Sequence, residues 1–452
     1  PIGRHLGVRG LLASRPLLTD RPSRADPVPM AAPLTSHGLE ESAEALSRGV
    51  MDWEAGNFGY LRNLQAAARN RGRVELMRCK KGADSGRLVA VKRMPNAWVQ
   101  HGPRAHEERF PHSSERPWRD LGILQELNRR SFPSVCQLLG VFRDQDVTYV
   151  VTSLATEGEL FEWCKRAPAL GREREVQMMP LVTQILTSVK LLHEYGVAHC
   201  DLSLENILLT RDDTGDLQVK LIDFGMSSPE RMRRGRADVG KPSYQAPETH
   251  SGMLYDAFLA DAFALGVVIF TMAAREYPWN ATKRGKCERY ECMHFHGWDR
   301  YAEEMTLHDG TGRAPCQVFS EELSELLGSL LTREPKGRAH LGEACYTSSA
   351  DAAKEGDEAA SGYSVWSLRW HDDASTDVGS EREDPDGLSL DEVASSEVES
   401  PTSAASAAPG PGLGESCGLH ARSASNGSSS ASTVASRSSS PRGGSAAEKP
   451  QS

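Results

Sequence analysis

The sequence contains no apolar run that approaches the length of a membrane-spanning helix, so we expect no contact with a membrane. Aromatic residues make up only 6% of the 452 residues and hydrophobic residues 39%, which is typical of a soluble globular core diluted by polar sequence. The nine cysteines are scattered and no secretory signal is evident. We therefore expect no disulfide framework and an intracellular, cytoplasmic protein. Nothing indicates nucleic-acid binding, and we expect a monomer.

The two ends of the chain have little apolar periodicity. From residue 347 onward Ser, Ala, Gly, Asp and Glu dominate, a composition that cannot bury enough surface to offset chain entropy. Residues 351–400 carry fifteen acidic and three basic side chains, so most of the net charge of -10 belongs to this tail. We expect a disordered tail over 347–452 and a disordered leader over 1–55. The Arg-containing start also admits a targeting segment.

The sequence between these ends has the pattern of an α+β domain, residues 56–346. β-forming residues at 73–77 and 88–92 around a turn-rich segment predict an antiparallel hairpin, and two more strands are expected at 138–142 and 147–152. A helix is expected at 118–127, and apolar residues spaced by three and four from 176 to 192 predict a long helix with one buried face. We therefore expect a bilobal fold, with a small β-rich lobe (56–154) and a larger helical lobe (155–346).

Residues suited to phosphoryl transfer cluster in two segments. The first runs from His199 through Asp201 to Asn206, and the second contains Asp223 followed by Phe and Gly. Phosphoryl transfer needs carboxylate and amide oxygens to hold magnesium, and a further carboxylate to orient the attacking hydroxyl. Asp201 is the candidate base, and Asn206 and Asp223 are the candidate metal ligands.

These segments resemble the catalytic loop and the Asp-Phe-Gly motif of eukaryotic protein kinases, in the family's order and at its spacing. Four further segments resemble the family in the same order. Residues 89–92 resemble the strand whose lysine grips the nucleotide phosphates, and residues 240–248 resemble the end of the activation segment. Residues 261–266 resemble the helix whose buried aspartate braces the catalytic loop, and residues 334–338 resemble the segment whose arginine pairs with Glu248. The resemblance implies a serine/threonine-type kinase that uses ATP and Mg²⁺ and acts on protein substrates.

The resemblance also implies a nucleotide site with residues from both lobes. They are Gly72 in the phosphate-covering loop, Val74 and Ala90 above adenine and Leu208 below it, Lys92 at the phosphates with Asp120 as its partner, Thr152 as gatekeeper, Ser153 and Ala155 at the hinge, Glu159 near the ribose, and Asp223 at the metal.

The phosphate-covering loop departs from the family pattern. Of three expected glycines only Gly72 is present, so backbone amides would approach phosphate less closely. Arg69 and Arg71 either compensate as phosphate ligands or are solvated surface side chains.

The partner of Lys92 departs as well. The alignment places Asp120 where the family has glutamate, so the side chain is one methylene shorter, and the pair can form if the helix sits closer. Glu126 is a competing candidate, because the register of a helix is easily misjudged from sequence.

The catalytic loop lacks two basic residues of the family. Ser203 replaces a lysine that neutralises the transferring phosphate, while Lys241 stands where those kinases have threonine. We expect Lys241 to restore this charge from the opposite side; a substrate-facing surface lysine is the alternative. Cys200 replaces the arginine that clamps a phosphorylated activation loop, so we expect activity without that phosphorylation.

Two further questions stay open at this stage. Cys287, Cys292, His294 and His296 suggest zinc, but their spacing is irregular and ordinary packing is the simpler interpretation. Glu159 and Glu205 favour basic residues near the target hydroxyl. The function expected is a protein serine/threonine kinase, and the alternative is a pseudokinase that binds nucleotide and acts as a scaffold.

Overall fold

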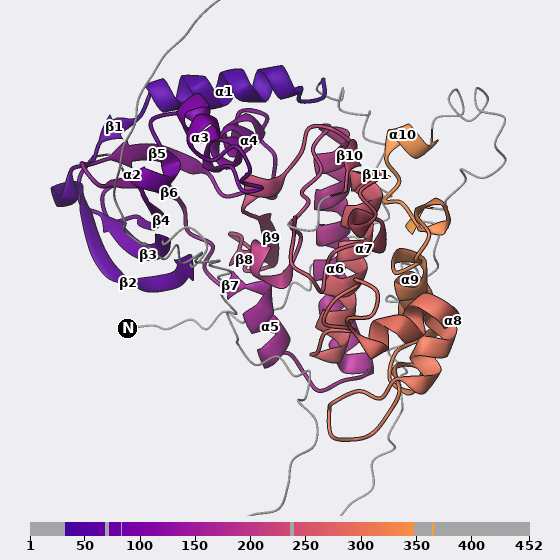
Figure 1. Cartoon of the computed structure of the whole chain (residues 1–452). Coiled ribbons are helices and arrows are strands. Elements are labelled where there is room, and N and C mark those ends of the chain that lie inside the picture. Colours follow the sequence, from indigo (N-terminus) through magenta and orange to yellow (C-terminus); the bar gives the residue numbers. More distant parts are fainter. Residues whose placement is uncertain (1–31, 68–71, 83, 236–238, 348–363, 366–452) are drawn as a thin grey trace, which may run out of the picture.

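The computed structural model describes residues 32–67, 72–82, 84–235, 239–347 and 364–365. Figure 1 shows two lobes, a β-sheet lobe in indigo and purple and a helical lobe in magenta and orange. The expected bilobal α+β fold is therefore confirmed. The tail beyond 347, apart from residues 364–365, and residues 1–31 with the possible targeting segment lie outside the described residues.

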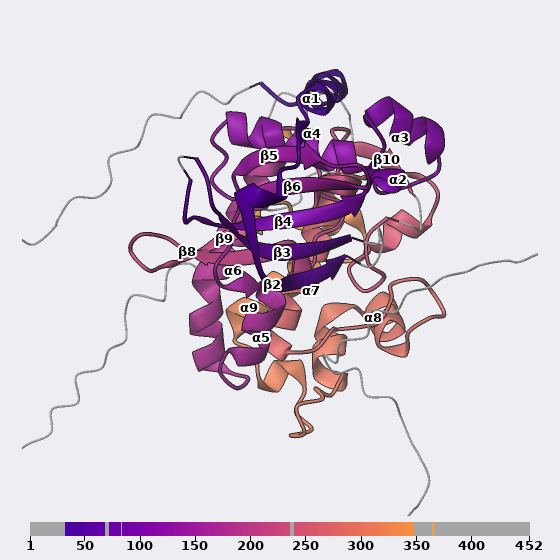
Figure 2. The ribbon, with the colours of Figure 1, turned by 90° about the vertical axis from the view of Figure 1, so that its left-hand side faces the viewer.

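The small lobe is built on a six-stranded sheet with the order β1-β5-β6-β4-β3-β2 (Figure 2). Its strands are β1 (Met51–Asp52), β2 (Phe58–Ala67), β3 (Gly72–Cys79), β4 (Leu88–Pro95), β5 (Leu138–Arg143) and β6 (Val147–Ser153). In β4, Val89 and Val91 are fully buried on one face, so the alternation of a strand places Ala90 and Lys92 on the other. The hairpin and strand predictions are confirmed.

Three helices connect β4 to β5: α2 (Asn96–Val99), α3 (Pro103–Arg109) and α4 (Pro117–Arg129). Helix α4 begins with Pro117, whose missing N–H costs nothing in the first turn. Its Trp118 donates its indole N–H to the Val99 carbonyl at 2.8 Å. The helix expected at 118–127 is therefore confirmed.

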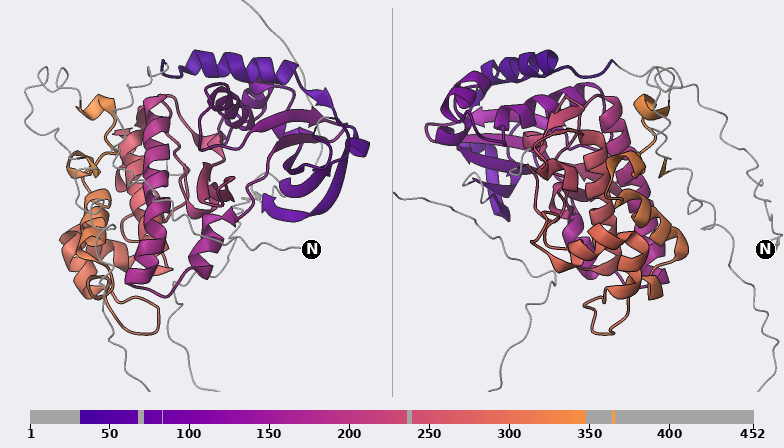
Figure 3. Two further views of the ribbon diagram at one scale, coloured as in Figure 1. Left: turned by 180° about the vertical axis from the view of Figure 1, so that it is seen from behind. Right: turned by 45° about the vertical axis from the view of Figure 1, so that its right-hand side comes forward.

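The N-terminal segment differs from the expected disordered leader. Residues Ser36–Arg48 form helix α1, capped by the Thr35 hydroxyl, which accepts the Gly38 N–H at 3.2 Å. Leu39, Ser42 and Ala43 are buried along one side of α1. Figure 3 shows α1 lying across the top of the small lobe. The apolar residues of α1 are too few to stand out in the sequence, but tertiary contacts stabilise the helix.

The large lobe is mainly helical. Its helices are α5 (Leu160–Arg166), α6 (Arg172–Glu194), α7 (Ala257–Ala274), α8 (Glu288–Glu304), α9 (Glu321–Leu330) and α10 (Ala344–Thr347). Short strands β7 (Gly158–Glu159), β8 (Ile207–Arg211) and β9 (Leu217–Leu221) form one sheet, and β10 (Met232–Arg234) pairs with β11 (Leu254–Asp256). The long helix predicted over 176–192 corresponds to α6.

Helix α7 corrects one expectation about composition. Its 18 residues are long and apolar enough to cross a membrane by length and composition, although the sequence seemed to contain no such run. However, 89% of this stretch is buried inside the lobe, where it packs among α6, α9 and β11 as the central core helix.

Candidate active site

A lysine and two carboxylates meet where the two lobes face each other. Lys92 on β4 places its Nζ 3.2 Å from Asp120 Oδ2 and 3.8 Å from Asp223 Oδ1. Burial opposes the charge on Lys92, but Asp120 and Asp223 outweigh it and raise the pKa of the lysine above its usual value. Lys92 is therefore a stable ammonium. The competing candidate, Glu126, pairs with Arg129 instead.

The second oxygen of Asp120 holds the segment that follows β9. Asp120 Oδ1 accepts the backbone N–H of Phe224 at 2.9 Å, and the Arg116 N–H donates to the Gly225 carbonyl at 3.0 Å. Asp223 itself has a left-handed backbone (φ 67°, ψ 68°), which is rare for a residue other than glycine. Helix α4 thus positions both the lysine partner and the candidate metal ligand.

The catalytic loop brings Asp201 and Asn206 together. The Asn206 amide donates to the Asp201 carbonyl at 2.7 Å and to its carboxylate at 3.1 Å, and both side chains are buried. Because the NH₂ group is used in this way, the amide oxygen is oriented as a candidate metal ligand. The Ile222 N–H donates to the Asn206 carbonyl at 3.1 Å, which connects this loop to the residue before Asp223.

Helix α7 braces the catalytic loop through a buried network. Asp261 accepts the backbone N–H groups of His199 at 2.6 Å and Cys200 at 2.8 Å. Its Oδ2 also lies 3.0 Å from His193, whose other ring nitrogen lies 2.7 Å from Glu343. Burial lowers the pKa of His193, but the bonds to the two carboxylates outweigh this and raise it to about 9.

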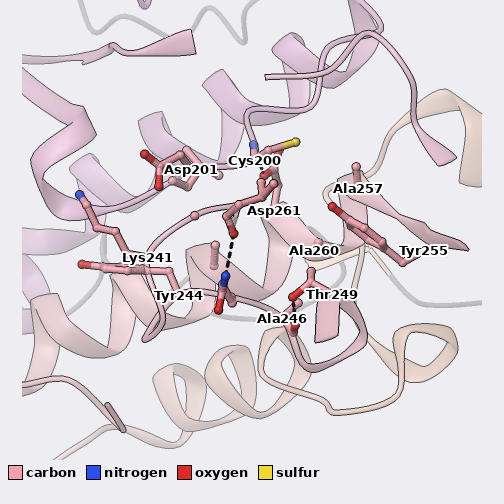
Figure 4. Close-up of a pocket in the computed structure, with 15 residues that line it drawn as sticks. Cys200, Asp201, Lys241, Tyr244, Ala246, Thr249, Tyr255, Ala257, Ala260 and Asp261 are labelled. Carbon is pink, nitrogen blue, oxygen red and sulfur yellow. Dashed lines mark hydrogen bonds between the residues drawn. The ribbon is translucent and has the colours of Figure 1, made fainter. Parts of the chain in front are cut away.

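Lys241 lies on the side of the catalytic loop that carries Ser203. Its Nζ is 2.5 Å from the Ser203 hydroxyl and 2.8 Å from Glu205 Oε2. Figure 4 shows Lys241 on the same side as Asp201 around a cavity of about 30 Å³. Burial alone would raise the pKa of Glu205, but Lys241 lowers it below its usual value. A cation therefore occupies the neighbourhood of Ser203, as expected from the exchanged residue types.

Arg233 on β10 is a residue that the sequence analysis missed. Its guanidinium donates to the Cys200 sulfur at 2.9 Å. Burial raises the pKa of Cys200 to about 12, so the thiol stays neutral. A cation from the activation segment thus reaches the position where the family has an arginine in the catalytic loop. In the sequence, the only indication of this contact is that Cys200 stands where the family has arginine.

The expected adenine-side residues lie on adjoining strands. Ala90 pairs with Thr152 and Val74 with Lys92, so these residues share one face of the sheet, while Leu208 on β8 pairs with Glu159. At the hinge, the Ser153 N–H donates to the Gln137 carbonyl at 2.9 Å, so this group is not available to a ligand. In the phosphate-covering loop, Gly72 begins strand β3, whereas Arg69 and Arg71 lie outside the described residues.

Two other expectations have clear outcomes. Arg338 and Glu248 form a buried, bidentate ion pair, which is confirmed (2.6 and 3.0 Å). For the segment with Cys287, Cys292, His294 and His296, zinc was the less favoured alternative, and among the described residues no group of three or more His, Cys, Asp or Glu side chains is arranged to hold a metal ion. His294 instead contacts Arg333.

Comparisons with known proteins agree with this geometry. A family model for the protein kinase domain matches residues 71–348. The chain belongs to the protein kinase family. A probable myosin light chain kinase of Dictyostelium discoideum is 31% identical over 212 residues, which cover 47% of this chain and 50% of that protein. CBL-interacting protein kinase 19 of Oryza sativa subsp. japonica is 29% identical over 270 residues, covering 58% and 45%.

The chain spans about half the length of these relatives. The match to the kinase family begins after β2, so helix α1 and strand β1 precede the part that resembles the family. All of the residues that form the candidate site lie inside the matched range.

The raised pKa of His193 predicts a pH dependence of stability. The unfolded imidazole has its usual value of 6.5, so protonation stabilises the fold fully below that pH, and this contribution is lost as the pH rises through about 9. We expect His193→Gln to remove a pH-dependent contribution on the order of 3 kcal/mol. Denaturant unfolding at several pH values between these limits measures it. The exposed His296→Gln variant is the control, and an unchanged slope in His193→Gln would contradict the assignment.

Proposed function

We propose that this protein is an ATP-dependent serine/threonine kinase, which transfers the γ-phosphoryl group of ATP to hydroxyls on other proteins. The observation that supports it most directly is the joining of Lys92 to both Asp120 and Asp223. In active protein kinases the lysine, its helix partner and the metal-binding aspartate must be in place together.

Each residue has a role consistent with its surroundings. Lys92 is a stable ammonium and would grip the α- and β-phosphates. Asn206 and Asp223 supply the amide and carboxylate oxygens that Mg²⁺ prefers, so the residues fit this ion. Magnesium in such a site neutralises charge on the phosphates. Asp201, oriented by Asn206, would accept the proton of the substrate hydroxyl.

The preference for basic residues near the target hydroxyl is proposed to be weak. Burial and the neighbouring Glu205 raise the pKa of Glu159, while Glu205 is already paired with Lys241. Thr271, at a position where basophilic kinases often carry a third acid, is fully buried and bonds to the Val267 carbonyl. The acidic surface for a basic substrate is therefore weaker than the sequence suggested.

A phosphotransfer assay tests the proposed function. We expect the chain to move labelled phosphate from ATP to serine or threonine of a protein substrate in the presence of Mg²⁺. Asp223→Ala should lower the rate by at least about 100-fold, whereas Asp213→Ala, in an exposed turn, should not. Analysis of the phosphorylated residue separates serine or threonine from tyrosine. Nucleotide binding without any transfer would instead support the pseudokinase alternative.

Lys241→Met tests whether this lysine supplies the charge missing at Ser203. Because the ammonium would stabilise the transferring phosphate, we expect kcat to fall by about 100-fold. Nucleotide affinity should change little, since Lys241 contacts the catalytic loop rather than the nucleotide strands. The exposed Lys283→Met variant is the control. Unchanged turnover in Lys241→Met would exclude this role.

The contact between Arg233 and Cys200 leads us to expect activity without phosphorylation of the activation segment. Phosphatase treatment should leave turnover unchanged. Arg233→Met should lower kcat by about tenfold through the loss of a charge-assisted hydrogen bond, while the exposed neighbour Arg234→Met should have little effect. A large loss of activity after phosphatase treatment would refute the expectation.

A further inference from the structure

The side chain of Asp120 is short, so its contact with Lys92 depends on where helix α4 lies relative to β4. Asp120 reaches Lys92 at 3.2 Å although it has one methylene less than the glutamate that the family resemblance implies. The contact therefore depends on what supports α4 from the side that faces away from the sheet.

Helix α1 packs against that far side at backbone distance. Gly122 lies two residues after Asp120, so the two positions are about 200° apart around α4 and face opposite ways. A Cβ at Gly122 would lie 3.1 Å from the Leu39 carbonyl oxygen and 3.2 Å from the Ala43 Cβ. Glycine is unfavourable inside a helix, and here its absence of a side chain permits this close approach.

Side chains on both sides of Gly122 complete the contact. Leu39 joins the core that contains Ile123 and Leu127 of α4. Ala43 joins a second core cluster with Trp118 and Leu121. Both α1 residues are almost fully buried. The interface therefore extends along most of α4, including the turn that carries Asp120.

The start of α1 is anchored to the large lobe. The Leu34 N–H donates to the Tyr195 carbonyl at 2.7 Å, and Leu34 is buried in the large-lobe core. Arg130, just after α4, donates to the Ala32 carbonyl at 2.5 Å. Figure 1 shows α1 running along the outer side of α3 and α4 from this anchor. The segment thus bridges the two lobes behind α4.

We propose that α1 is a built-in clamp that holds α4 close enough for Asp120 to reach Lys92, so that Ala43 and Gly122 are positioning residues for phosphoryl transfer. This inference rests on the proposed kinase function for its effect on turnover. Its effect on Lys92 itself is independent of that function. The clamp precedes residues 71–348, the range that matches the kinase family model.

The test compares two identical substitutions on α1 in the full-length chain. Ala43→Asp puts a carboxylate into the buried interface, whereas Ala45→Asp lies on the exposed side of the same helix. We expect Ala43→Asp to lower kcat by about tenfold to 100-fold, because small misplacements of catalytic groups are costly. Ala45→Asp should leave kcat unchanged. Gly122→Ala, which adds one methyl group, should give a smaller change in the same direction.

A second readout measures Lys92 without any phosphotransfer. When α4 lies farther from the sheet, the Lys92 amine loses its 3.2 Å contact with Asp120 and opens to reagents, so acylation becomes faster. We expect an amine-reactive ester to label Lys92 several-fold faster in Ala43→Asp than in Ala45→Asp, as measured by mass spectrometry. This comparison remains decisive even if the chain transfers no phosphate.

A rescue variant separates positioning from a general folding defect. If α4 has moved outward, the longer side chain of Asp120→Glu should reach Lys92 again. In the Ala43→Asp background it should therefore recover most of the lost turnover and slow the labelling of Lys92. Equal labelling of the Ala43→Asp and Ala45→Asp variants, or no rescue by Asp120→Glu, would overturn the proposal.

Discussion

The contact that organises the site is the one between Lys92 and Asp120. One oxygen of this carboxylate holds the lysine ammonium at 3.2 Å, and the other accepts the N–H of Phe224 at 2.9 Å. A single short side chain on α4 therefore positions a strand of the small lobe and the segment that carries Asp223. Because the aspartate side chain is short, even a small displacement of α4 would weaken both the contact with Lys92 and the hydrogen bond from Phe224.

A second constraint is electrostatic. The catalytic loop has lost basic residues at Cys200 and Ser203, and each of these side chains is contacted by a cation from the segment after Asp223, namely Arg233 and Lys241. The positive charge next to the catalytic loop is therefore supplied by side chains of the segment after Asp223. As a result, the electrostatics of the loop depend on the order of the activation segment rather than on the loop's own residues.

Motif spacing was enough to select the residues at the centre of the candidate site. Lys92, Asp201, Asn206 and Asp223 sit in short segments whose residue types and order depend on local chemistry. Helix α1 was missed because its stability comes from contact with Gly122, more than 70 residues away. Arg233 was missed because no pattern around it marks a partner in the catalytic loop. The apolar run of α7 was misjudged because Asp261 interrupts it, although that aspartate is buried and fully engaged.

Gly122 shows why these long-range features matter for the chemistry. Glycine is unfavourable inside a helix, because it loses more backbone conformational entropy on folding than other residues and has no side chain to pack. Here the missing side chain lets the backbone of α1 approach α4 directly, on the face opposite Asp120. Gly122 and Asp120 thus belong to one arrangement. The side chain of Asp120 is short on one side of α4, and Gly122 lets α1 support the helix closely from the other side.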